Sequence, residues 1–336
     1  MIRSKESRRR TVAALQMLGV AAAYYASAQL GFLQEVVVDG AVVTPLWPPT
    51  GIALGALLYL GTRIWPGIAL GALVTIIDIS GSLTLYGVVI AAGNTVAPLC
   101  AFLMLRRIGF RVELDRLRDG VALVFVGALL GMLISATVGA GALLLSDKLP
   151  LDRFWLVWSA WWVGDAMGVL VVTPFLLVLR RARMPRRTDR WAEAALLLVT
   201  ALAVTLVATR GTLSMIYLVF PVLIWAALRF ELPGSAPCAL LVSVAAVTAG
   251  REAVGPFEDH TVLEVMVNLN ILNGCVALTA LLLAAIVTEH QNIRRETELA
   301  CEELAALVDQ LAPLPPIPRP GTGIGSDTGP WDEDDR

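Results

Sequence analysis

The feature that most constrains this chain is a succession of long apolar segments, separated by short polar ones, that begins at Thr11 and ends near Thr288. A helix needs ~20 mostly apolar residues to cross the ~30 Å hydrocarbon core of a bilayer. Hydrophobic residues make up 57% of the 336 residues and charged residues only 16%, whereas a soluble domain has ~25% charged residues. The pattern therefore predicts an all-α fold, a polytopic transmembrane helix bundle.

The number of crossings follows from the lengths of these segments. Several segments are short and would need tilting or shielding by neighbouring helices, so eight full spans with one re-entrant pair is the alternative to ten. Either count is even and places both termini on the same side of the membrane. We expect about ten spans, at 11–33, 48–62, 65–80, 84–106, 120–146, 154–180, 191–209, 212–230, 235–250 and 261–288.

The distribution of positive charge predicts the orientation of the spans. With the N-terminus inside, 22 of the 26 Lys and Arg residues fall in inner segments; the outer segments hold only Lys148, Arg153, Arg210 and Arg251. Loops rich in Lys and Arg stay in the cytoplasm. We therefore expect a bacterial cytoplasmic-membrane protein with both termini in the cytoplasm. The net charge of −2 gives no indication of a nucleic-acid partner.

The segment after the last span changes character. Apolar residues such as Ile293, Leu304 and Leu307 recur at spacings of four and three between glutamates, which predicts a short coiled-coil-like stalk that continues the last helix. At under three heptads the stalk is marginal alone; it would form a parallel homodimer, or lie on the membrane or on another part of the chain. The expected divisions are a basic N-terminus (1–10), a membrane domain (11–289), the stalk (290–312) and a disordered acidic tail (313–336).

Polar residues at membrane depth are the candidates for a functional site, because they are costly there and usually face a bundle interior or a cavity. Asp165 lies near the middle of its span, and Asn94 sits similarly in the fourth span. Asp78 lies near the outer end of the third span, and Asn270 lies in the last one. Asp165 would be a ligand contact, a proton-sensitive switch or a helix–helix latch; a buried structural carboxyl is the alternative. For the asparagines, hydrogen bonding between helices is favoured over ligand contact.

The tryptophans differ in their predicted depth in the membrane. Trp47 fits an outer aromatic belt, whereas Trp161 and Trp162 lie deeper and are expected to be pocket walls. No Ser–His–Asp signature, phosphate-binding loop or nucleotide fingerprint is present. The two histidines cannot build a histidine-rich metal site, and the four cysteines are isolated. We expect no enzymatic activity, no cofactor and no metal.

Several motifs, in order, resemble the first type of membrane-associated sensor domain, the MASE family of bacterial signalling proteins. The resemblance covers about residues 47–290. Trp47 and Arg229, which occur in these motifs, are also candidate sensing residues. At Glu231 it leads us to expect glycine. The motifs are Trp47-Pro-Pro-Thr-Gly-Ile-Ala; Gly61-x-Arg-x-Trp-Pro-Gly-Ile-x-Leu-Gly; Gly93-Asn-Thr; Trp161-Trp-x-Gly-Asp-x-x-Gly; Pro221-x-x-x-Trp-Ala-Ala-x-Arg-Phe; and Gly255-Pro-Phe.

The resemblance implies a sensory input module, which in that family normally precedes a histidine kinase, a cyclase or phosphodiesterase, or a serine phosphatase. No such output domain follows the last span here, so we expect a sensor that acts through its stalk or a separate cytoplasmic kinase, phosphatase or cyclase. Two alternatives remain: a small-molecule secondary transporter, which also shows broken helices and midplane polar residues, and a membrane scaffold for a kinase or phosphatase. Membrane lipids are the other expected partners.

Overall fold

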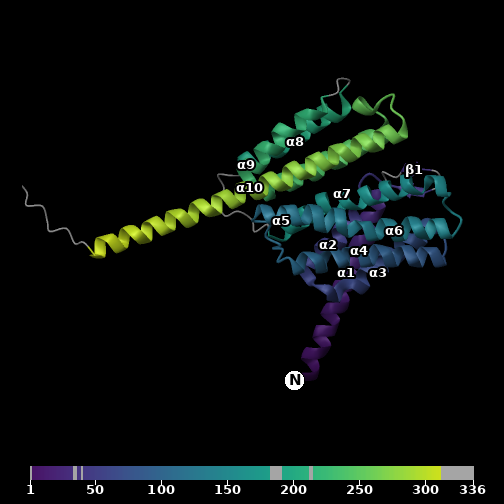
Figure 1. The fold of residues 1–336 in the computed structure, drawn as a ribbon, viewed down its shortest axis with the longest axis horizontal. Helices are drawn as coiled ribbons and strands as arrows, with labels where there is room; N and C mark the ends of the chain where they lie inside the picture. The colour runs from purple at the N-terminus through teal and green to yellow at the C-terminus, as the bar shows by residue number, and fades with distance from the viewer. Residues whose placement is uncertain (1, 33–35, 39–40, 182–190, 212–214, 312–336) are drawn as a thin grey trace, which may run out of the picture. The chain divides into compact units, whose positions relative to one another are not determined.

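The computed structural model describes residues 2–32, 36–38, 41–181, 191–211 and 215–311. It divides into two units, residues 1–290 and residues 291–336. The predicted acidic tail lies outside the described residues. The all-α prediction is confirmed: the described residues form helices, apart from one antiparallel hairpin in which β1 (Val36–Val38) pairs with β2 (Ala41–Val43) (Figure 1).

The helices follow the predicted apolar segments closely. The three-residue segments η1, η3, η5 and η6 are 3₁₀ turns, and η2 is a π-helical stretch between α5 and α6. The helical elements are α1 (Ile2–Phe32), α2 (Pro48–Leu60), η1 (Thr62–Ile64), α3 (Trp65–Ser80), α4 (Leu85–Arg107), α5 (Leu117–Ala122), η2 (Leu123–Leu130), α6 (Gly131–Leu145), η3 (Leu151–Arg153), α7 (Phe154–Arg181), α8 (Trp191–Arg210), η5 (Ile216–Leu218), α9 (Val219–Glu252), η6 (Gly255–Phe257) and α10 (Val262–Leu311).

Eight helices within the described residues are long and apolar enough to cross a membrane, and α2 is a shorter apolar helix of 13 residues. One of the eight, α9, is two helices. Glu231 has φ 55° and ψ −143°, outside the helical region, and a Cβ built on Gly234 would lie 3.0 Å from the Ala226 carbonyl oxygen eight residues earlier. The chain therefore reverses at Glu231, and the two arms of α9 correspond to the predicted segments 212–230 and 235–250.

Contacts between helices give their directions. α1 and α3 run parallel, since a Cβ on Gly67 would meet Met17 and Tyr25 donates a hydrogen bond to Asp78. α4 and α6 run antiparallel, with Gly93 against Val138 and Gly131 against Ala101. The second arm of α9 runs antiparallel to α10, since Ser235 donates to the Ala280 carbonyl oxygen and a Cβ on Gly250 would meet Leu269. These directions agree with a chain that alternates between the two faces of a bilayer.

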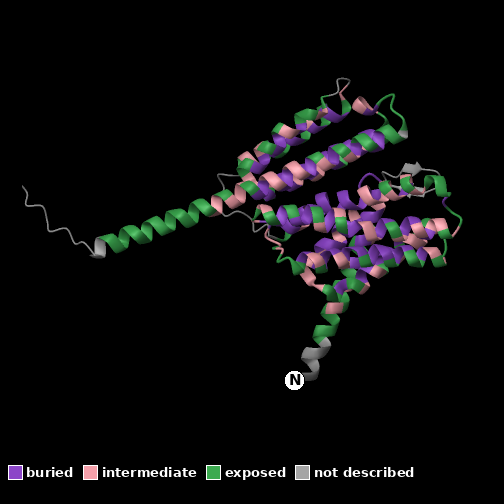
Figure 2. Cartoon of the chain, viewed as in Figure 1, coloured by how far each residue is buried: buried purple, intermediate pink, exposed green. Residues whose placement is uncertain are grey.

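Helix α7 is the centre of the membrane unit. The span that contains it, Leu151–Arg180, has 72% of its most apolar window buried, the largest share among the candidate spans in the described residues. Figure 2 shows the buried surface concentrated along α7 and its neighbours, while outward-facing residues are exposed. The exposed side chains include many large apolar ones, such as Leu85 and Trp155, as expected for a surface covered by lipid.

Candidate functional site

Two glycines of α7 allow another segment of the chain to lie directly on its backbone. A Cβ on Gly164 would lie 2.4 Å from the Thr44 carbonyl oxygen, and one on Gly168 would lie 1.9 Å from the Trp47 carbonyl oxygen. No larger residue fits at either position. The Trp47 amide donates a hydrogen bond of 3.0 Å to the Gly164 carbonyl oxygen. The residues between Thr44 and Trp47 are therefore fixed against the middle of a membrane-spanning helix.

This arrangement places the first turn of α2 beside Asp165. Proline at the first two positions suits a helix N-terminus, because those amides have no partner within the helix. Thr50, in that turn, donates a hydrogen bond of 2.6 Å to Oδ1 of Asp165. The positive end of a helix dipole stabilises a nearby carboxylate. The Asp165 side chain, 1% exposed, thus has one oxygen held by α2.

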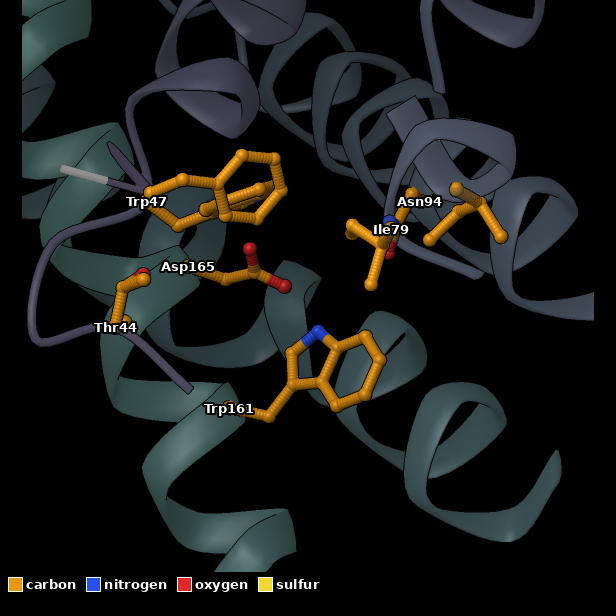
Figure 3. A pocket seen from close by; sticks show the side chains of 9 residues that line it. Thr44, Trp47, Ile79, Asn94, Trp161 and Asp165 are labelled. Carbon is orange, nitrogen blue, oxygen red and sulfur yellow. The ribbon is translucent and has the colours of Figure 1, made fainter. Parts of the chain in front are cut away.

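The other carboxylate oxygen has no partner in the described part of the protein. Oδ2 of Asp165 is buried and has no hydrogen-bond partner among the residues that the structure describes. Figure 3 shows Trp47 and Trp161 on either side of the carboxylate, with the indole nitrogen of Trp161 pointing toward it, and Asn94 and Ile79 across from it. Together with Thr44 these residues line a cavity of about 60 Å³. That volume holds roughly four water molecules.

Polar side chains of α1, α4 and α6 lie in and behind the cavity wall. Ser135 of α6, itself 1% exposed, donates a hydrogen bond of 2.8 Å to Oδ1 of Asn94. Tyr24 of α1 is also 1% exposed and lies close enough to interact with Asn94 and Trp47. The Trp161 ring lies against Gly139, where a Cβ would come within 2.7 Å of it. Five helices therefore contribute to one buried polar cluster around Asp165.

The structure brings together four of the eight candidate residues: Asp165, Asn94, Trp161 and Trp47. Trp47 is a wall of the cavity and not only a belt residue. The adjacent Trp162 lies elsewhere: its indole nitrogen donates a 2.7 Å hydrogen bond to the Leu129 carbonyl oxygen of η2, and its ring stacks on Trp158.

The other three candidates are separate from the cavity. Asp78 accepts hydrogen bonds from Tyr25 and Gln29 at the ends of α1 and α3. Arg229 pairs with Glu193 and joins α9 to α8. Oδ1 of Asn270, on α10, is buried without a hydrogen-bond partner among the described residues. These placements favour pairing roles for Asp78 and Arg229.

Three residues of this polar cluster were not predicted from the sequence: Thr50, Ser135 and Tyr24. Thr50 carried a signal, because it belongs to the Trp-Pro-Pro-Thr motif that precedes a short apolar helix. Ser135 and Tyr24 carried none: a serine or tyrosine in an apolar segment is ordinary, and only the packing of α1, α4 and α6 reveals that they meet Asn94. In the described residues there is no group of three His, Cys, Asp or Glu side chains that could hold a metal ion.

A bundle of membrane-spanning helices around a buried, partly unpaired carboxylate defines an integral membrane protein with an internal site. The MASE1 family model matches residues 16–291, and the chain belongs to this family, which is a membrane sensory input domain. The chain is also 27% identical over 210 residues to the probable diguanylate cyclase DgcE of Escherichia coli (strain K12). That match covers 59% of this chain and 18% of the relative, so the chain spans about a fifth of the length of that protein. No solved structure matches.

Proposed function

We propose that this chain is a sensory input module in which the Asp165 cavity reads a cue and α10 carries the response out of the membrane. The observation that carries the proposal is the Asp165 carboxylate. It is buried at the middle of the span Leu151–Arg180, its side chain lines a cavity, and one of its oxygens has no hydrogen-bond partner among the described residues. A carboxylate in such a place is costly. An occupant of the cavity that interacts with Oδ2 would reduce that cost and so favour one arrangement of the helices.

The first route from the cavity to α10 runs along α7. Met167, two residues after Asp165, reaches α10, where its methyl carbon lies 3.9 Å from a Cβ built on Gly274. One and two turns further, Leu170 and Pro174 face Ala277 and Leu281 of α10 across a small apolar gap. A shift or rotation of α7 would therefore be transmitted to α10 through direct contacts.

The second route runs through the helix formed by α5, η2 and α6. Its α6 part carries Ser135, which binds Asn94 in the cavity wall. At its other end, the Leu117 amide donates a hydrogen bond of 2.9 Å to Oε2 of Glu289 on α10. Between them lies the π-helical η2, and π-helical stretches occur often at functional sites. A change at Asn94 would thus reach α10 at the point where it leaves the apolar span.

The remaining parts of the proposal concern the output. Both termini would lie in the cytoplasm, as the arginine distribution predicts. From Ile293 to Val308 every side chain of α10 is exposed in the single chain (Figure 2), including the apolar Leu304 and Leu307. This surface would contact a second copy of the chain or a separate cytoplasmic kinase, phosphatase or cyclase. The chain itself would not be an enzyme.

The test uses the full chain in lipid nanodiscs and measures amide hydrogen exchange along α10. Asp165→Asn keeps the shape of the side chain and an acceptor for Thr50, but it removes the charge. If the cavity and α10 are coupled, exchange of the amides between Glu289 and Val308 should change by about fivefold or more, the usual size of coupling between two sites.

The matched control is Asp78→Asn, which removes the carboxylate near the end of α3 while keeping an acceptor for Tyr25 and Gln29. Exchange in α10 should then equal that of the wild type. The proposal fails if Asp165→Asn leaves the exchange of these amides unchanged, or if both variants alter it equally, since the second result would indicate general destabilisation.

A further inference from the structure

We infer that the Asp165 cavity binds a small organic cation of the alkylammonium class. The role of that cation as the cue rests on the function proposed above, whereas its binding can be measured separately. The first part of the argument is charge. Asp165 is the single charged side chain among the described residues that line the cavity, and the others are aromatic, aliphatic or uncharged polar groups. A buried carboxylate without a cationic partner is strongly unfavourable.

The second part is the orientation of the carboxylate. Thr50, in the first turn of α2, donates its hydrogen bond to Oδ1. Oδ2 is buried and has no partner among the described residues. The Asp165 side chain lines the cavity, with its carboxylate between Trp47 and Trp161 (Figure 3). A cation in the cavity would complete the coordination of Oδ2, and an anion would be repelled by it.

The third part is the nature of the walls. Trp47 and Trp161 lie on either side of the carboxylate, and Phe32 lies 5.3 Å from Trp47 between ring centroids. Indole faces attract cations within ~6 Å of the ring centroid, and several aromatic rings around one carboxylate are typical of sites for alkylated ammonium groups. An inorganic cation needs many oxygen ligands, whereas aromatic walls suit an organic one.

The fourth part is size. A volume of about 60 Å³ holds roughly four water molecules, which corresponds to a compact group such as tetramethylammonium and not to a drug-sized ligand. Gly139 sets this volume, because the Trp161 ring occupies the space where a side chain at that position would be. The cavity thus combines one negative charge, aromatic walls and small volume.

The experiment measures binding of choline and of its uncharged isostere 3,3-dimethylbutan-1-ol to the full chain by titration calorimetry. The protein is held in nanodiscs of phosphatidylethanolamine and phosphatidylglycerol, which carry no choline headgroups. We expect choline to bind at least about tenfold more tightly than the isostere, which corresponds to ~1.4 kcal/mol. Equal binding of the two, as a neutral protonated Asp165 would give, overturns the inference, and so does the absence of choline binding.

Variants locate the site. Asp165→Asn and Trp161→Phe should each weaken choline binding, the first by about tenfold and the second by less, because phenylalanine retains a weaker aromatic face. Trp162→Phe and Asp78→Asn, which change neighbouring groups outside the cavity, should bind choline as the wild type does. Unchanged binding by both cavity variants would place any choline site elsewhere and contradict the inference.

The comparison of choline with its isostere uses only the wild-type chain. It therefore tests the inference even if a variant fails to fold. The outcomes also separate the two proposals. Altered exchange in α10 of Asp165→Asn without choline binding would keep the sensory role and reject the ligand class. Choline binding without any effect of Asp165→Asn on α10 would keep the ligand class and reject the relay.

Discussion

At the scale of single residues, Gly168 is the position on which the geometry of the cavity most depends. It lets the Trp47 carbonyl approach the α7 backbone so closely that an added Cβ would lie 1.9 Å from it. Because Trp47 and Thr50 are adjacent to this contact, the same glycine determines how Asp165 meets its hydrogen-bond donor.

Gly168→Ala should therefore destabilise the protein by about 3 kcal/mol or more, as expected when backbone must move to relieve an overpacked contact. Thermal unfolding in detergent, followed by tryptophan fluorescence, would measure the loss. The matched control is Gly19→Ala in α1, where a Cβ meets nothing within 4 Å. That change should stabilise the helix by about 0.5–1 kcal/mol. Similar transition temperatures for the two variants would contradict the close contact.

The sequence predicted the site residues only in part, and the reasons lie in individual side chains. Asp165 and Asn94 could be found because a carboxylate or amide in an apolar segment is costly. Trp161 and Trp162 could not be told apart, because they are adjacent and successive residues of a helix point about 100° apart. The packing of α7 directs Trp161 to the cavity and Trp162 to Leu129. Ser135 could not be found, since a hydroxyl in a membrane helix can bond its own backbone.

At the scale of elements, the turn within α9 corresponds to the turn between α2 and α3. Gly61, which ends α2, has φ 76° and ψ −175°, and Glu231 has φ 55° and ψ −143°. This region of backbone space is nearly restricted to glycine. The sequence predicted both hairpins, and the resemblance indicated that glycine was expected at Glu231. The sequence could not predict that Glu231 adopts the backbone conformation expected of glycine. The packing of the two arms of α9 favours the turn in spite of the glutamate side chain.

Glu231→Gly should relieve this strain and raise the free energy of unfolding by about 1–2 kcal/mol. Chemical or thermal unfolding in detergent would measure the change, with Ala245→Gly as control within the same element. Ala245 lies inside the second arm of α9 in an ordinary helical position, so glycine there should cost about 1 kcal/mol. If both substitutions destabilise equally, the Glu231 backbone is not strained.

At the scale of the whole molecule, the alternation of helix directions and the positions of the basic residues make one prediction together. Several arginines assigned to inner segments lie at helix ends: Arg106 and Arg107 end α4, Arg180 lies at the end of α7, and Arg229 ends the first arm of α9. The sequence could predict the membrane-spanning helices because hydrophobic length acts over whole segments, whereas the orientation from charge stays a prediction. The sequence could not predict where α7 and α2 touch, which depends on individual side chains.

Cys301 provides a direct test of the orientation. It is exposed and lies on α10 beyond the apolar span. In a variant that keeps Cys301 as its single cysteine, a membrane-impermeant maleimide should label this residue in inside-out vesicles and leave it unlabelled in intact cells. A variant with a single cysteine at exposed Lys148, in a predicted outer segment, should show the reverse pattern. Labelling of Cys301 in intact cells would reverse the proposed orientation.

The shortness of α2 has a consequence for how the protein is made. At 13 residues and 1.5 Å per residue the helix is about 20 Å long, well below the thickness of the hydrocarbon core. The α7 surface that covers it, where Tyr59 meets Leu176, comes 117 residues later in the chain. The newly synthesised α2 is therefore poorly suited to leave the translocon alone. We therefore expect the α2–α3 hairpin to stay near the insertion machinery or α1 until α7 has been translated, so that the Asp165 site assembles only after that step.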